Sequence, residues 1–99
     1  LTLSRELFEN GLFIFDKLES DKITIKSRNN KKSLSVEFEG FPYVGIWAPE
    51  KGAPFMCIEP WFGHPDYEDF KGEFKEREGS VKVKVNESFT CSYRFTIAE

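Results

Sequence analysis

The stretch from residue 40 to residue 63 reads GFPYVGIWAPEKGAPFMCIEPWFG. Two apolar segments, 43–47 and 55–58, lie on either side of a loop over residues 49–54 that is rich in proline and glycine. Proline removes a backbone donor and glycine permits positive φ, so these residues interrupt regular structure. The stretch therefore predicts two β-strands joined by an irregular loop.

The rest of the chain shows the same period of two. Apolar and polar residues alternate over residues 23–26, 34–39 and 81–85, as expected for strands with one buried and one wet face. Residues 12–15 form a continuous apolar run, which is typical of a strand covered on both sides, and residues 89–97 contain a further strand. Together these segments predict about seven strands in an all-β, antiparallel sandwich.

Local signals refine this prediction. We expect a strand-like start at Leu1, a polar hairpin tip over residues 28–32, and a short helical turn that residues 64–66 open, with Asp66 as its N-cap. Lys82 and Lys84 are expected to face solvent between the buried valines of their strand.

Composition excludes several functional classes. The 99 residues carry 14 basic and 17 acidic side chains, a net charge of −3, so we expect no nucleic-acid or membrane partner. An aromatic content of 16% argues against disorder. No secretory leader is visible, which predicts a soluble cytoplasmic protein. So many aromatic side chains require more partner surface than 99 residues provide, and we expect residues 1–99 to be one β segment of a larger domain.

Cysteine and histidine are scarce. Cys57 and Cys91 are expected to be buried, unpaired thiols in a reducing compartment. His64 is the single histidine, and no neighbouring residue has metal-ligand spacing, so we expect no metal site. An acid role for His64 beside Glu59 is one interpretation, and a water-exposed loop histidine is the favoured one.

Glu59 stands out because it ends an apolar strand among aromatic residues. Apolar burial disfavours the charged carboxylate, so its pKa is expected to rise toward neutrality, as a general acid or base requires. The alternative is a strand-end glutamate that faces solvent or pairs with a lysine. Trp47 and Trp61 have flat rings that suit the C–H face of a pyranose, although core packing also explains tryptophan in a sandwich.

Segments 41–47 and 57–63 resemble the C-terminal third of the aldose 1-epimerase (galactose mutarotase) family, with the LacX-like branch as the best match. Residues 7–16 and 87–93 match the same pattern in order. This resemblance implies the C-terminal part of a large galactose-mutarotase-like β-supersandwich. It also implies an isomerase that interconverts the α and β anomers of a free aldose, of galactose or glucose type, without a metal or any other cofactor.

The resemblance also implies residue roles. Glu59 would remove the proton from the anomeric hydroxyl, while a histidine outside this chain protonates the ring oxygen. The missing N-terminal part of the fold is then a required partner, and the chain alone is expected to be inactive. Gly11 departs from the pattern, because many relatives carry a sugar-binding aspartate there. Asp16 follows five residues later, on the opposite face of a regular strand.

Two other classes remain open. A non-catalytic carbohydrate-binding β-sandwich would use Trp47 and Trp61 as a platform and would bind sugar without Glu59 chemistry. An immunoglobulin-like interaction domain would also have seven strands, with Cys57 and Cys91 as its intersheet pair. The second class lacks its usual tryptophan, because Trp61 follows Cys57 by only four residues.

Overall fold

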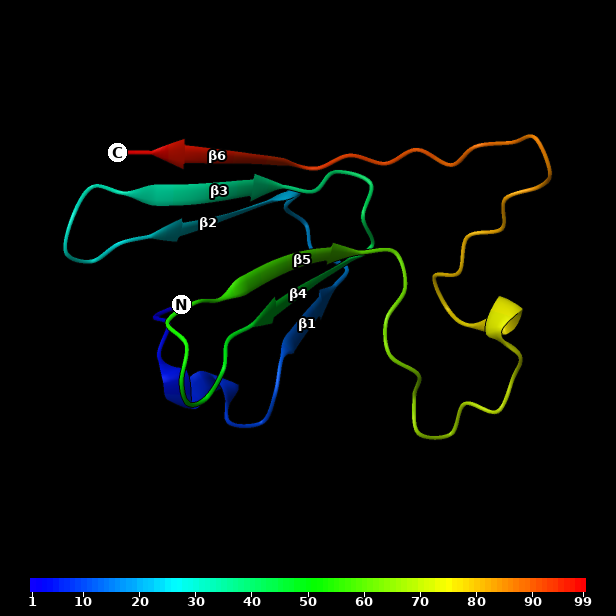
Figure 1. Cartoon of the computed structure of the whole chain (residues 1–99), viewed down its shortest axis with the longest axis horizontal. Helices are drawn as coiled ribbons and strands as arrows, with labels where there is room; N and C mark the ends of the chain where they lie inside the picture. The colour runs from blue at the N-terminus through cyan, green and yellow to red at the C-terminus, as the bar shows by residue number, and fades with distance from the viewer.

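Six strands form two antiparallel three-stranded sheets in the computed structural model, which describes all 99 residues (Figure 1). The strand orders are β1-β4-β5 and β2-β3-β6. The strands are β1 (Phe13–Asp16), β2 (Lys22–Lys26), β3 (Ser33–Glu37), β4 (Tyr43–Trp47), β5 (Cys57–Trp61) and β6 (Arg94–Ala98), and the two 3₁₀ helices are η1 (Arg5–Phe8) and η2 (Phe74–Glu76). The predicted all-β, antiparallel class is confirmed.

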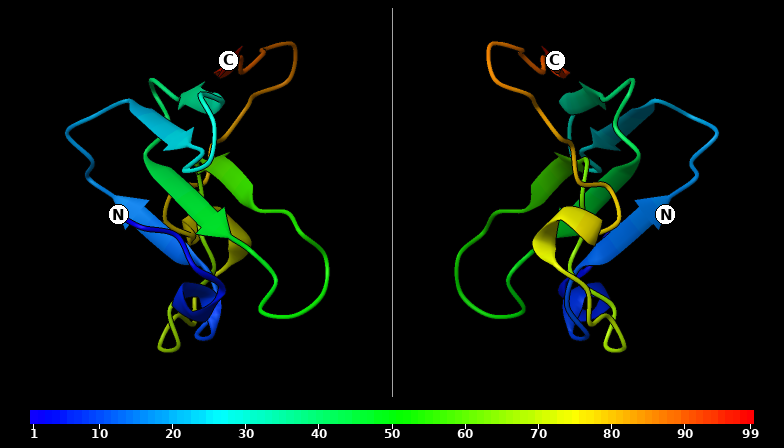
Figure 2. Two further views of the ribbon diagram at one scale, coloured as in Figure 1. Left: turned by 90° about the vertical axis from the view of Figure 1, so that its left-hand side faces the viewer. Right: turned by 90° about the vertical axis from the view of Figure 1, so that its right-hand side faces the viewer.

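The apolar faces of the two sheets supply the core. Val36 on β3 lies opposite Ile23 on β2 and Phe95 on β6, so one side of this sheet is apolar throughout. Val44 on β4 is only 1% exposed. Ile46, beside Val44 on the same face of β4, lines a cavity with Ile23, so the two inner faces meet there. Figure 2 shows the sheets from both ends as two layers.

The first and last thirds of the chain differ from the prediction. The chain starts with η1 rather than a strand, because this turn places Phe8 in the core, edge-on to Phe13 with ring centroids 5.6 Å apart. The predicted strand over residues 81–85 is wrong. Its residues are exposed and pair with no other strand, although Lys82 and Lys84 do face solvent as expected.

A long connection joins β5 to β6 (Figure 1). No helix directly follows residues 64–66: a single hydrogen-bonded turn closes from Phe70 N–H to the Tyr67 carbonyl at 3.0 Å, and the predicted N-cap is wrong, because the Asp66 carboxylate accepts a hydrogen bond from Arg77 Nε at 2.6 Å. Near its two ends the connection is held together by Phe62, which packs edge-on to Phe89 with ring centroids 5.0 Å apart. Neither short helix is long or apolar enough to cross a membrane.

The chain exposes much apolar surface. Its accessible area is 8321 Å², whereas a compact monomer of this mass exposes about 5,800 Å². The radius of gyration is 16.2 Å, against about 13 Å for a compact domain of this length.

Cys57 and Cys91 are both unpaired, as predicted, but Cys91 is exposed because the whole stretch after residue 80 lies on the surface.

Candidate functional site

One face of the β1-β4-β5 sheet gathers the three predicted site residues. Trp47 lies opposite Cys57, Gly45 opposite Glu59, and Tyr43 opposite Trp61 in the β4–β5 ladder. Directly opposed residues, and every second residue along a strand, point to the same side of a sheet. Glu59, Trp47 and Trp61 therefore share one face, on the side opposite to the buried Val44.

Trp61 holds the Glu59 carboxylate. Its indole Nε1 donates a hydrogen bond to Glu59 Oε2 at 3.1 Å, and both residues are half-buried. Gly45 makes room for this arrangement, because a Cβ at that position would lie 2.8 Å from Trp61 Cζ2. Glu59 forms no ion pair, so the lysine-paired alternative does not hold.

Trp47 lies on the other side of Glu59 from Trp61. It is half-buried, and its ring packs against Phe55 with centroids 5.8 Å apart. The sheet thus presents three consecutive rows on one face: an indole, a carboxylate opposite a glycine, and a second indole. A flat molecule that stacks on either indole would therefore lie next to the carboxylate.

A second cluster lies beside Trp61. His64 Nε2 is 3.0 Å from Glu78 Oε2, and the Tyr43 hydroxyl donates to Glu78 Oε1 at 3.1 Å. The imidazole also packs edge-on to the rings of Tyr43 and Tyr67, with centroids 4.9 and 5.0 Å away. The prediction of a water-exposed histidine is wrong, since the His64 side chain is only 9% exposed.

The surroundings of His64 favour its protonated form. The Pro65 carbonyl oxygen, 2.7 Å from Nδ1, and then the Glu78 carboxylate raise the pKa of His64 above 6.5. The hydrogen bonds from His64 and Tyr43 lower the pKa of Glu78 below 4.5. Desolvation and then the Glu78 carboxylate raise the pKa of Tyr43. Both shifts favour the charged form of the group concerned, as expected for an ion-pairing contact between His64 and Glu78.

Sequence reasoning missed this cluster. Tyr43 and Glu78 are 35 residues apart, and His64 and Glu78 are 14 apart in an irregular segment, so no local periodicity links them. The five-residue spacing of Gly11 and Asp16 predicts that they lie on opposite faces of a regular strand. Asp16 lies opposite Tyr43 on β1, hence on the same face as Trp61, whereas Gly11 precedes the strand.

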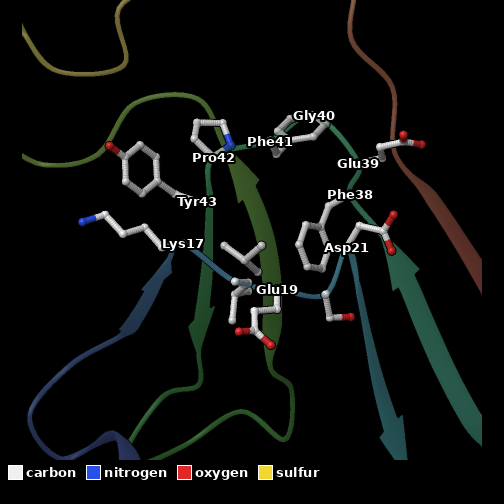
Figure 3. A pocket seen from close by; sticks show the side chains of 12 residues that line it. Lys17, Glu19, Asp21, Phe38, Glu39, Gly40, Phe41, Pro42 and Tyr43 are labelled. Carbon is white, nitrogen blue, oxygen red and sulfur yellow. The ribbon is translucent and has the colours of Figure 1, made fainter.

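Two cavities flank this face. The first lies where the β1–β2 and β3–β4 connections meet, has a volume of about 470 Å³, and has charged side chains around it that include Lys17, Glu19 and Asp21 (Figure 3). The second, about 600 Å³, is lined by Trp61, His64 and Glu78 among others. Glu59 lines neither of them. No three His, Cys, Asp or Glu side chains gather where they could hold a metal ion.

Comparisons with known proteins relate the whole chain to part of the LacX proteins and to part of a galactose mutarotase related enzyme. No protein-family model matches the chain. The chain is 30% identical over 97 residues to the chromosomal and plasmid LacX proteins of Lactococcus lactis subsp. lactis, which covers 98% of this chain and 32% of each relative. A solved structure of a galactose mutarotase related enzyme from Lactobacillus acidophilus superposes with a TM-score of 0.89 at 28% identity, covering 100% of this chain and 34% of that one. The chain thus spans about a third of these relatives.

Proposed function

We propose that this chain, which is related to the LacX proteins and folds as part of an aldose-epimerase-like structure, carries the catalytic base of an aldose 1-epimerase-like site. The substrate is a free hexose of galactose or glucose type, whose α and β anomers are interconverted. The observation that carries the proposal is the half-buried Glu59 carboxylate, held by the Trp61 indole and lying between two tryptophans on one face of the sheet.

The geometry suits proton transfer. Trp61 occupies Glu59 Oε2 and leaves Oε1 without a hydrogen bond from this chain. In the proposed step Oε1 takes the proton of the anomeric hydroxyl, the O–H electrons form the C1 carbonyl, and the C1–ring-oxygen bond breaks. The ring oxygen takes a proton from an acid outside this chain, which the family resemblance implies to be a histidine. Rotation about C1–C2 and closure on the other face return both protons and give the other anomer.

Trp47 and Trp61 are the proposed sugar-binding residues. They lie one row to either side of Glu59 on the same face. A pyranose has an apolar C–H face that packs on aromatic rings, while its hydroxyls seek polar partners. A sugar ring placed against these indoles would bring its anomeric hydroxyl toward the carboxylate between them.

The partner we propose is the remainder of the same fold. Phe95 and Ile97 belong to the apolar side of the β2-β3-β6 sheet, yet they are 64% and 70% exposed. Strands of this kind are normally covered by a second layer. The matched structure has about two thirds of its length beyond the region that this chain covers. Without that part the chain lacks the acid, and we expect it to be inactive alone.

The test is NMR anomer exchange on glucose and galactose, using the intact protein that carries these residues. We expect exchange above the water background, and Glu59→Gln should reduce its rate by about a hundredfold or more, as loss of a general base does. Glu50→Gln is the matched control, since Glu50 is an exposed loop residue whose side chain forms no ion pair. Exchange that is indifferent to Glu59→Gln would contradict the proposal. Sugar binding that survives Glu59→Gln without any exchange would favour a carbohydrate-binding sandwich.

A further inference from the structure

Glu78 links two segments to the end of β5. Its Oε1 accepts the hydrogen bond from Tyr43, which begins β4 and lies directly opposite Trp61. Its Oε2 contacts His64, three residues after Trp61 in the sequence, at 3.0 Å. One carboxylate therefore joins the strand beside Trp61 to the segment that follows Trp61.

The backbone next to Glu78 closes over the same place. A Cβ on Gly79 would collide with the Phe62 carbonyl oxygen and lie 2.8 Å from Gly63 Cα. The backbone at residue 79 therefore packs directly on the two residues that follow Trp61. This close approach leaves the end of β5 little room to move while the contacts of Glu78 are in place.

Charge strengthens the link. The groups around the His64 imidazolium are the Pro65 carbonyl, the Glu78 carboxylate, the Asp66 carboxylate, and the rings of Tyr43 and Tyr67. Glu78 is the only carboxylate in contact with the ring, because Asp66 pairs with Arg77. Removal of the Glu78 carboxylate would leave Nε2 of the nearly buried His64 ring without its partner at 3.0 Å.

We infer that Glu78 is a positioning residue for the Glu59–Trp61 pair. Through Tyr43 and His64 it fixes the end of β5, and thereby the indole that holds the Glu59 carboxylate. Glu78 does not touch Glu59. It affects the Glu59 carboxylate only because it fixes the position of the Trp61 indole. The inference rests on the proposed function for its effect on turnover, but its structural part is independent of any activity.

The structural part is tested by NMR of the Trp61 indole N–H in the intact protein. The resonance is assigned by its absence in Trp61→Phe. We expect Glu78→Gln to shift this resonance and to speed its exchange with solvent, whereas Glu68→Gln leaves both unchanged. Glu68 is an exposed glutamate of the same connection whose side chain takes part in none of the ion pairs of the structure. An unchanged indole resonance in Glu78→Gln would overturn the inference.

The kinetic part separates this inference from the proposed function. Glu78→Gln should lower kcat for anomer exchange by about tenfold and also raise KM, because Trp61 both holds Glu59 and is one of the two proposed sugar-binding rings. Wild-type kcat in Glu78→Gln, with kcat lost in Glu59→Gln, would overturn the positioning role alone. Should Glu78→Gln fail to fold, Tyr43→Phe removes one hydrogen bond to Glu78 and keeps the ring. The Trp61 indole N–H resonance of Tyr43→Phe then tests the positioning role, and we expect a smaller shift than in Glu78→Gln.

Discussion

The indole Nε1 of Trp61 donates a hydrogen bond to Oε2 of Glu59, two residues earlier on the same strand, at 3.1 Å. Alternate residues of a strand share a face, so this contact needs no change of backbone direction. It does need space on the neighbouring strand, and Gly45 provides it. The orientation of the proposed base is therefore set by one tryptophan and one glycine.

Replacement of Trp61 by phenylalanine tests the hydrogen bond apart from the ring. Trp61→Phe keeps an aromatic surface and removes the donor to Glu59. We expect the anomer-exchange kcat to fall by about tenfold, because a carboxylate that has lost its positioning partner samples unproductive rotamers. Urea unfolding should show a loss of about 1 kcal/mol, the usual net value of one hydrogen bond. Wild-type turnover in Trp61→Phe would show that the indole does not position Glu59.

A methyl group at residue 45 tests the space under the indole. In Gly45→Ala the new Cβ would lie 2.8 Å from Trp61 Cζ2 and 3.1 Å from Leu12 Cδ1. We expect a loss of about 1–3 kcal/mol in the free energy of unfolding, since overpacking forces neighbours to shift. The Trp61 indole N–H resonance should move as well.

Gly63→Ala is the matched control for that substitution. A Cβ at residue 63 meets only the Glu78 carbonyl oxygen, at 3.8 Å, which is ordinary van der Waals contact. We expect its unfolding free energy to stay within about 0.5 kcal/mol of wild type. Equal effects of the two substitutions would mean that contact with the indole is not the cause.

Local patterns predicted most of the strands and the aromatic surroundings of Glu59, and the register places Glu59, Trp47 and Trp61 on one face. Strand β4 has the predicted bounds, and β5 runs from Cys57 to Trp61, three residues beyond the predicted end. The register then follows from alternation, because each apolar residue on the inner face places its neighbours on the outer one. Only the role of these residues depends on the family resemblance.

Contacts between distant segments lay beyond such patterns. The alternation of residues 81–85 indicates a possible strand, yet a strand requires a partner, and none pairs with this segment. Glu78 is one of many charged residues in a polar connection, and only the tertiary fold brings it to Tyr43 and His64. Gly45 likewise carries no signal until the position of the Trp61 ring is known.

The His64–Glu78 pair predicts a pH window for stability. The folded pKa of His64 lies above 6.5, so its contribution is complete below pH 6.5 and is lost as the pH rises through the folded value. The folded pKa of Glu78 lies below 4.5, so its contribution is complete above pH 4.5 and is lost as the pH falls through the folded value. The coupling between the two residues should therefore be largest between pH 4.5 and 6.5.

A double-mutant cycle measures this coupling. Urea unfolding of the wild type, His64→Gln, Glu78→Gln and the double variant at several pH values gives the interaction free energy directly. We expect it to decline on both sides of the window. A coupling that stays constant up to pH 9 would show that the imidazolium is not the partner of Glu78.

The backbone contact at residue 79 has its own test. Gly79 and Gly52 both have positive φ, at 83° and 100°, but a Cβ at Gly52 would meet open space. Both alanine substitutions place a side chain at a positive φ and so cause similar backbone strain. The difference between their losses of unfolding free energy therefore reports the collision with Phe62. We expect Gly79→Ala to be less stable than Gly52→Ala by about 1–3 kcal/mol in urea unfolding. Equal losses would mean that the 78–79 segment is not held against the end of β5.

Substitutions on the exposed strand β6 test whether the remainder of the fold covers its apolar side. Phe95 lies on the apolar side of β6, 64% exposed, and Thr96 lies on the polar side. If the remainder of the fold covers the apolar side, Phe95→Ala should lower the unfolding free energy of the intact protein by about 3 kcal/mol, the cost of truncating a buried phenylalanine. Thr96→Ala should change it by less than about 0.5 kcal/mol. Small effects from both would mean that Phe95 stays exposed in the intact protein, and that the rest of the fold packs elsewhere.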